Sequence, residues 1–320
     1  MPIQLSKYAC RGVSMDETSM HSWKIRSLLQ RAVPVAAAAV CVVWIVGQIQ
    51  KDRTWLTGLM FYVPTPLLVG GLLFLSGISV KRWTSRWKWF SALAVVPMIF
   101  LCFVENHWWR GPTTTAGGTT LRLVHWNLCR TALGWDAQRR LIESLKPDIL
   151  VLSETTTDVE ADDFPGFEVL QIQGMLIASR GQMTASGSLV PKRVLEAFQI
   201  HCELPTGPLD VLIADMTSNL NIHRDLYLQP LLKVMEDRQP DLVVGDFNAP
   251  RRSLAFSSLP EGFQHAYDVA GAGWSYTWPV PVPFLAIDQC ILGPGVTATN
   301  YQLRSTLLSD HRIQILDFQL

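Results

Sequence analysis

The sequence near the carboxyl end reads Leu242-Val243-Val244-Gly245-Asp246-Phe247-Asn248, an apolar run that ends on a carboxylate and a carboxamide. Alternate residues of a β-strand point to opposite faces of its sheet, so Asp246 and Asn248 are expected to share one face. They follow the buried part of the strand, and ligands of layered α/β folds collect at the carboxyl ends of strands. Asp and Asn also end strands at ordinary turns, so this pair needs support from elsewhere in the chain.

Other segments of the chain also deliver a polar side chain to the end of an apolar run. They are Leu121–Asn127, which ends on Asn127; Lys146–Glu154, which ends on Glu154; Ala286–Asp288; and Leu308–His311, which precedes the alternating stretch Ile313–Phe318. Together with the first run they make five strand-like segments, and strand ends of this kind meet at one edge of a layered fold. The sequence therefore predicts that these polar side chains converge on one site.

The residue types at these ends suit a divalent cation and a phosphate. Glu154 and Asp310 supply the hard oxygen ligands that Mg²⁺ or Mn²⁺ prefers. Asn127 and Asn248 add neutral oxygens or amide donors for a phosphate or an ordered water. His311 follows a carboxylate, and Asp288 is available to orient its imidazole for a role beside a phosphoryl group. Cys and His clusters with zinc spacing are absent from the sequence.

In the order and type of these residues, about Thr119 to Leu320 resembles the endonuclease/exonuclease/phosphatase superfamily. That group includes deoxyribonuclease I, exonuclease III, neutral sphingomyelinases and inositol polyphosphate 5-phosphatases. The resemblance rests on the first-strand Asn, the metal-binding Glu, a Gly-Asp-x-Asn motif and a final Ser-Asp-His motif, here Asn127, Glu154, Gly245–Asn248 and Ser309–His311. Two further segments are similar to family segments, Gly273–Pro279 with its Thr-Trp pair and Gly174–Arg180. The resemblance implies a two-sheet α/β sandwich flanked by helices, with four layers in the order α/β/β/α.

The resemblance also implies a role for each site residue. Glu154 would hold the divalent metal, Mg²⁺ or Mn²⁺, with help from Asn127 and Asp310. Asp246 would align or deprotonate the attacking water, while Asn248 would bind the scissile phosphate together with Asn127 and Arg224. His311, oriented by Asp288, would stabilise the pentacoordinate phosphorus, and no covalent nucleophile is needed. Independently of any family, phosphoryl transfer needs developing charge on phosphate oxygens to be neutralised by a metal and fixed donors.

One position departs from the family pattern. The strand-like stretch Leu209–Ala214 leads into Asp215, where the family usually has a His, and an ionised carboxylate cannot donate a hydrogen bond to a phosphate. Three outcomes are open: His223 in the following loop replaces the missing donor, Asp215 binds a second metal, or the chain has lost phosphodiesterase activity. Downstream, Arg224 begins a stretch predicted to be helical to about Glu236.

The first third of the chain has a different character. Three apolar, nearly uncharged stretches follow one another with short basic loops between them, Ala32 to Ile49, Trp55 to Val80 and Trp89 to Val104. A helix rises 1.5 Å per residue and a hydrocarbon core is about 30 Å thick, so each stretch is long enough, or nearly so, to span a membrane. Trp residues near the ends suit the membrane–water interfaces. The sequence predicts an all-α anchor of three transmembrane helices.

The basic residues beside these stretches predict an orientation. Five Lys or Arg precede the first stretch, two follow it, four lie between the second and third, and one closely follows the third. The positive-inside rule then places the amino terminus in the cytoplasm and the domain after the third stretch outside it. The predicted parts are a cytoplasmic tail at 1–31, a three-span region at 32–110, a flexible linker at 111–118 and the catalytic domain at 119–320.

Charge does not select one substrate. Residues 119–320 hold 15 Lys and Arg against 23 Asp and Glu, so no basic stripe for gripping duplex DNA is visible. The sequence predicts a membrane-anchored, divalent-metal-dependent phosphoesterase, with a nucleic acid or a phospholipid head group as the candidate substrate. The alternative is a catalytically inactive binding or scaffold protein that keeps the fold. No protein partner can be inferred, and the three cysteines of the domain leave both one disulfide and free thiols open.

Overall fold

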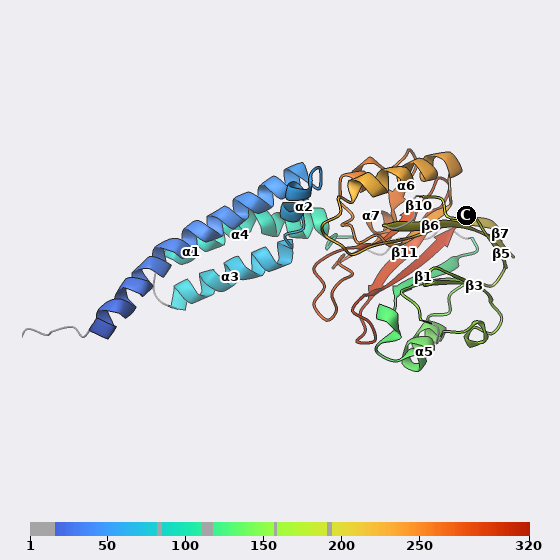
Figure 1. Ribbon diagram of the computed structural model, residues 1–320, viewed down its shortest axis with the longest axis horizontal. Helices are drawn as coiled ribbons and strands as arrows, with labels where there is room; N and C mark the ends of the chain where they lie inside the picture. The colour runs from blue at the N-terminus through green and yellow to red at the C-terminus, as the bar shows by residue number, and fades with distance from the viewer. Residues whose placement is uncertain (1–16, 82–84, 111–117, 157–158, 191–193) are drawn as a thin grey trace, which may run out of the picture.

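A computed structural model describes residues 17–81, 85–110, 118–156, 159–190 and 194–320. The chain forms a helical region followed by an α/β domain, which lie end to end (Figure 1). The predicted linker at 111–118, apart from residue 118, lies outside the described residues, as does the predicted tail up to residue 16. The rest of that predicted tail, from residue 17, is the beginning of the first helix.

Two six-stranded mixed sheets make up the α/β domain. The first sheet has the order β11-β12-β1-β2-β4-β3, with β11 at Thr297–Arg304, β12 at Ile313–Gln319, β1 at Leu121–Asn127, β2 at Ile149–Ser153, β4 at Met175–Ser179 and β3 at Glu168–Ile172. The second has the order β5-β6-β7-β8-β10-β9, with β5 at Gln182–Ala185, β6 at Leu195–Leu204, β7 at Gly207–Met216, β8 at Leu242–Asp246, β10 at Asp288–Leu292 and β9 at Gln264–His265. The pairs β1–β2 and β7–β8 are parallel, and the other pairs are antiparallel.

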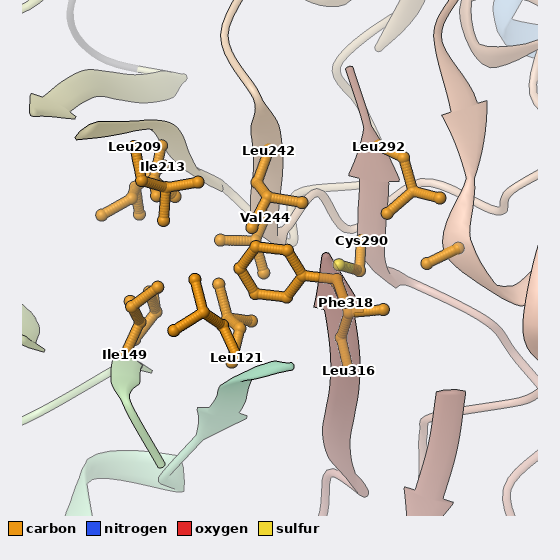
Figure 2. Close-up of a cluster of buried hydrophobic side chains, with 14 of the residues drawn as sticks. Leu121, Ile149, Leu209, Ile213, Leu242, Val244, Cys290, Leu292, Leu316 and Phe318 are labelled. Atoms are coloured by element: carbon orange, nitrogen blue, oxygen red, sulfur yellow. The ribbon is translucent and has the colours of Figure 1, made fainter. Parts of the chain in front are cut away.

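The domain has the four layers that the resemblance to the family implies. The inner faces of the two sheets pack together through a buried apolar core, part of which Figure 2 shows, with Leu121, Ile149 and Phe318 from the first sheet against Leu242 and Val244 from the second. Helix α5, Trp135–Leu145, covers the outer face of the first sheet, and helix α6, Asp225–Arg238, covers the outer face of the second. Short helices fill some of the connections, namely 3₁₀ turns at Cys129–Thr131, Ala161–Asp163 and Ala255–Ser258 and α7 at Ala266–Ala270.

Strand alternation aims the site residues at the space between the sheets. In β8, Leu242 and Val244 belong to the inner core, whereas Val243 packs outward against the α6 side. Asp246 continues the inward series, because side chains two residues apart point to the same face. The same alternation places Asn127 of β1 on the inner face of its sheet. The inner core therefore ends in a layer of polar side chains.

The helical region has four α-helices within the described residues. They are α1 at Glu17–Gln50, α2 at Trp55–Phe61, α3 at Thr65–Lys81 and α4 at Arg86–Phe100, and α4 continues as a π-helical turn at Leu101–Glu105. Two segments, Arg31–Gln50 and Arg86–Glu105, are long and apolar enough to cross a membrane. The remaining predicted span is split into α2 and α3, which meet at 55°, so the prediction of three spans is not confirmed. Pro64 in the connection lacks a backbone N–H donor, which favours this break.

The ends of the helices contact the domain directly. The Asp52 carboxylate accepts a hydrogen bond from the backbone N–H of Leu254 at 2.6 Å, and the Glu105 carboxylate accepts one from the Tyr276 hydroxyl. Arg251 donates to the Glu105 carbonyl at 2.8 Å, and the Arg252 guanidinium lies 4.4 Å from the Phe100 ring centroid. Buried charged groups are costly unless they are paired, so these contacts attach the helices firmly to the domain.

A buried histidine makes the domain sensitive to acid. The His265 ring in β9 is 6% exposed and packs edge-on against the Phe256 ring. Burial, with a smaller contribution from Arg251, lowers the pKa of His265 to about 4 from its usual 6.5. The unfolded chain therefore binds this proton first as the pH falls. The neutral His265 ring contributes fully to the free energy of unfolding above about pH 6.5. This contribution, about 3 kcal/mol, is lost as the pH falls from 6.5 toward 4.

We expect the variant His265→Phe to lose less stability in acid than the wild-type protein. The substitution keeps an aromatic ring beside Phe256, whose ring centroid lies 5.6 Å from that of His265. Denaturant unfolding at pH 7 and pH 4 measures the free energy of unfolding, and the loss between the two should be smaller in the variant by about 3 kcal/mol. Equal losses in both proteins would mean that His265 is not held neutral.

Candidate active site

Three carboxylates lie side by side across the second sheet. Asp246 at the end of β8 is paired in register with Asp288 at the start of β10 and with Asp215 near the end of β7. Gly245 makes this close packing possible, because its φ is 154° and a Cβ there would lie 1.7 Å from the carbonyl oxygen of Ala214. A side chain at position 245 would therefore clash with β7, so glycine is required before Asp246. Its absence of a side chain lets the two strands pair closely at the site.

Asn127 joins this row to the first sheet. Its side-chain amide donates hydrogen bonds to Asp246 at 3.0 Å and to Glu154 at 3.2 Å, and its amide oxygen accepts one from the backbone N–H of Cys129 at 2.9 Å. Glu154 follows β2 directly and has a φ of 51°, the left-handed region that non-glycine residues rarely adopt. Asn127 therefore holds both carboxylates in place.

The loop before β12 brings in Asp310 and His311. The Ser309 hydroxyl donates to the backbone carbonyl of Asn127 at 2.7 Å and accepts from the backbone N–H of His311 at 3.0 Å, which fixes the loop against β1. The Trp278 indole donates to Asp310 at 2.9 Å. Nδ1 of His311 lies 2.9 Å from Asp288, and Nε2 lies 4.0 Å from Asp246. The structure thus brings Asn127, Glu154, Asp246, Asp288, Asp310 and His311 together.

Charge within this cluster stabilises a protonated imidazole. Burial of His311 favours the neutral ring, but Asp288, Asp246 and Asp310 outweigh it and raise the pKa of His311 to about 9. Burial raises the pKa of Asp288, but the contact with His311 lowers it. The contact with His311 outweighs burial, so the pKa of Asp288 lies below its usual value. The pair is therefore an imidazolium and a carboxylate at neutral pH, and Nε2 of His311 carries a proton that it can donate.

Burial and repulsion act on the other two aspartates. The pKa of Asp246 is raised well above its usual 3.8 by burial and by the neighbouring Asp288. The pKa of Asp215 is raised to about 7 by burial and then by repulsion from Glu154 and Asp288. Crowded acids of this kind are stabilised by a further positive charge, so the cluster favours a bound cation.

The residues fit a hard divalent cation at the Glu154 and Asp310 side of the cluster. Asp246, Asp288 and His311 offer atoms within 4.8 Å of one another, but the imidazolium is not a metal ligand and is paired with Asp288. Oδ1 of Asp310 is buried and has no hydrogen-bond partner within the described part of the chain. Burial, Asp310 and Glu154 all raise the pKa of the nearby Cys129 thiol, so both carboxylates lie close to it. Direct coordination by Asn127 stays a prediction.

The position that departs from the family pattern lies inside the site. Asp215 pairs with Asp246, and with a pKa of about 7 a share of its carboxyl groups is protonated at neutral pH and can donate a hydrogen bond. His223 has a different contact, because its Nε2 lies 2.6 Å from the backbone carbonyl of Asp52 in the helical region. In this arrangement His223 is held away from the cluster and does not replace the missing donor.

A cavity of about 440 Å³ opens beside the cluster. Its lining includes Glu154, Asp246, Asn248, Asp310 and His311 together with Tyr62, Pro64, Ser218, Leu220, Arg224, Trp278, Phe284, Leu285 and Ile287. Arg224 is 5% exposed, and its Nε atom has no hydrogen-bond partner among the atoms of the described residues. Asn248 adopts a φ of 47° and donates through Nδ2 to the Met216 carbonyl at 2.7 Å. The predicted substrate-binding residues Arg224 and Asn248 thus face one cavity with the predicted catalytic residues Asp246 and His311, whereas Asn127 and Asp288 do not line it.

Comparison with known proteins agrees with this arrangement. Residues 124–311 match the model of the endonuclease/exonuclease/phosphatase family. The chain belongs to this family. Its members hydrolyse phosphate esters, which is the reaction class that the site residues predict. No curated protein sequence matches the chain.

Several solved structures share the fold. A D. rerio TDP2 in complex with a single-strand DNA product has 17% sequence identity, covers 63% of this chain and 100% of its own, and gives a TM-score of 0.50. A mannosyl-6-phosphatase from Bacteroides thetaiotaomicron has 14% identity, covers 62% of this chain and 100% of its own, and also gives 0.50. A family protein from the same organism has 13% identity, coverage of 62% and 97%, and a TM-score of 0.51. At these identities the likeness establishes the fold and leaves the substrate open.

The cavity residues that come from the helical region could not be found from the sequence. Tyr62 and Pro64 lie between α2 and α3, and the Tyr62 hydroxyl donates to the backbone carbonyl of Asn248 at 3.1 Å across 186 positions. The Arg224 guanidinium lies 5.4 Å from the centroid of the Tyr62 ring. No local motif marks this contact, because it depends on how the helical region is placed on the domain.

Proposed function

We propose that this protein is a membrane-anchored, divalent-metal-dependent hydrolase of phosphate esters. The observation that carries the proposal is the hydrogen-bonded cluster of Asn127, Glu154, Asp246 and the His311–Asp288 pair. Glu154, Asp246 and His311 of this cluster line the cavity. Glu154 and Asp310, with Asn127, are the proposed metal ligands for Mg²⁺ or Mn²⁺. A bound ion of this kind would neutralise charge on the phosphate oxygens and make a bound water more acidic.

The chain's own residues have separate tasks in the proposed reaction. Asp246 accepts a proton from the attacking water, which requires its carboxylate form and is favoured by the nearby His311 imidazolium. Arg224, Asn248 and Asn127 bind the phosphate oxygens. His311 donates a hydrogen bond from Nε2 to the oxygen that gains charge in the transition state, while Asp288 keeps the ring charged and oriented. Protonated Asp215 supplies a further donor.

The proposed placement in the membrane follows the ends of the helices. We infer a tail at 1–31, an anchor at 32–110, a linker at 111–118 and a catalytic domain at 119–320. The ends of α1, α3 and the π-helical turn that face the domain are Gln50, Thr65 and Glu105, and the distal ends carry Lys81 and Arg86. More basic residues flank the distal ends than the domain-side ends, so the positive-inside rule favours an extracytoplasmic domain.

Removal of the metal is expected to stop the reaction reversibly. The full chain, purified in detergent, is assayed with bis(p-nitrophenyl) phosphate and p-nitrophenyl phosphate in Mg²⁺. Chelation with EDTA should lower turnover by at least about 100-fold, because the carboxylate cluster then lacks its compensating charge, and added Mg²⁺ should restore it. Calorimetry measures Mg²⁺ binding in the same samples. A protein that binds no divalent ion and turns over neither ester would instead be the inactive scaffold.

A further inference from the structure

We propose that the substrate is a phosphate ester carried by a membrane lipid, and that the helical region forms one wall of its binding site. The inference rests on the proposed function and names the substrate class for the same cavity. Five observations support it. They concern the depth of the cavity in the membrane, the contacts between the helices and the site residues, the apolar lining of the cavity, the exposed aliphatic residues on nearby loops, and the contacts of the basic residues Arg251 and Arg252.

The first observation is the depth at which the cavity lies. Tyr62 and Pro64 line it, and they stand between Phe61 and Thr65 at the domain-side end of the helical region. The candidate spans end on the same side at Gln50 and Glu105. The ends of spans mark the boundary between the hydrocarbon core and the head groups, so this wall lies at head-group depth.

The second observation is that the helices hold the site residues at this depth. The Tyr62 hydroxyl donates to the Asn248 carbonyl at 3.1 Å, and the Tyr62 ring faces the Arg224 guanidinium. The preceding loop adds the contact between His223 and the Asp52 carbonyl at 2.6 Å. Two of the proposed phosphate-binding residues are therefore in direct contact with the segment that connects the helices.

The third observation is that the lining suits a molecule with a charged head and an apolar tail. His311, Arg224 and Asn248 face the cavity at the cluster, whereas Pro64, Phe284, Leu285 and Ile287 give it an apolar wall. Pro64, Phe284 and Leu285 also line a second, smaller cavity with Phe61 and Val63, so the apolar wall continues toward the helices. A water-soluble phosphate ester would leave this apolar surface without a partner.

The fourth observation concerns the rim. Leu220, Val282 and Leu307 are 53%, 66% and 75% exposed, and they lie on three loops that carry or adjoin site residues. The loops at Val282 and Leu307 are joined, because the Val280 N–H donates to the Asp310 carbonyl at 2.7 Å. In Figure 1 the orange-to-red loops of the domain project toward the helical side. Exposed aliphatic side chains on loops next to the site fit insertion into a bilayer surface.

The fifth observation favours a lipid over a nucleic acid. Arg251 and Arg252 follow the site in sequence, but both contact the helical region. Arg251 donates to the Glu105 carbonyl, and Arg252 lies over the Phe100 ring. Residues 119–320 carry 15 basic against 23 acidic side chains. Binding to a nucleic-acid backbone depends on several cations, and the excess of acidic side chains in this domain disfavours it.

Crosslinking tests which lipid occupies the cavity. A benzophenone amino acid replaces Phe284 in the wall, Val282 on the rim or Leu320 at the carboxyl end, which lies far from the helices in Figure 1. The full chain is reconstituted with Mg²⁺ in nanodiscs of equal parts phosphatidylglycerol and phosphate-free galactolipid. At position 284 we expect phospholipid adducts to exceed galactolipid adducts by at least about fivefold. At position 282 the two lipids should react equally, and at position 320 neither should react.

Variants at the two ends of α6 supply the matched control, because Arg224 directly precedes the helix and Arg238 ends it. Arg224→Ala should reduce the enrichment at position 284 to near one, whereas Arg238→Ala, at the exposed end of the same helix, should leave it unchanged. Equal labelling by both lipids at position 284, or labelling at 320 as strong as at 284, would overturn the proposal. Turnover of bis(p-nitrophenyl) phosphate in the same samples separates the two ideas: turnover without enrichment rejects only the lipid, and absence of both turnover and Mg²⁺ binding rejects the proposed function.

Discussion

Replacement of Glu154 by glutamine is expected to lower turnover of bis(p-nitrophenyl) phosphate by about 10³-fold. The substitution keeps the size of the side chain, and an amide oxygen can still accept the hydrogen bond that Asn127 donates at 3.2 Å. It removes the negative charge of a proposed metal ligand, which weakens the binding of the ion and its stabilisation of charge on the phosphate. Steady-state kinetics across Mg²⁺ concentrations and calorimetry measure the two effects separately.

A surface glutamate of similar size gives the matched control. Glu143 lies on α5, is 48% exposed and pairs with Arg139 at 2.7 Å, so Glu143→Gln should leave both kcat and Mg²⁺ affinity near the wild-type values. Weak Mg²⁺ binding together with unchanged maximal turnover at high Mg²⁺ would mean that Glu154 binds the ion but that its charge does not act in the transition state. Unchanged binding and turnover would exclude Glu154 from the metal site.

The resemblance to the family implies the sandwich, whereas strand alternation and residue type predict the individual strands that carry the site. The run at 242–248 forms β8 with Asp246 at its end, and the predicted first strand and last alternating stretch form β1 and β12. Side chains two residues apart share a face, so the inward position of Asp246 follows from that of Leu242 and Val244. The helix predicted from Arg224 is α6, which begins one residue later, at Asp225.

Contacts between distant segments could not be predicted in the same way. The pairing of Asp215 with Asp246 depends on β7 and β8 being neighbours in the sheet. This pairing affects how Asp215, which stands where the family usually has a His, is interpreted. A carboxyl group with a pKa of about 7 can act as the donor that an isolated Asp could not. The role of Tyr62 depends on the break between α2 and α3, which apolar composition alone does not reveal, because both helices and their connection are apolar.

Asp288→Asn is expected to lower turnover by about 10³- to 10⁴-fold. The asparagine keeps the shape of the side chain beside His311 but not the charge that holds the imidazolium, whose Nδ1 lies 2.9 Å from Asp288. Loss of the orienting carboxylate in other imidazole-based sites has an effect of this size. Asp237→Asn, on an exposed part of α6, is the control and should turn over the ester at the wild-type rate.

The pH profile of the same variant tests the electrostatic cause. Burial alone would keep His311 neutral, and in the wild-type protein the surrounding carboxylates raise its pKa to about 9, so the imidazolium is lost only as the pH rises through that value. Without the charge of Asp288 the pKa falls, and the alkaline limb of kcat should move to lower pH. The residual activity of Asp288→Asn should therefore rise as the pH is lowered from 9 toward 6, until Asp246 is protonated. An alkaline limb at the same pH in both proteins would mean that Asp288 only positions the ring, and that the proton on Nε2 has another source.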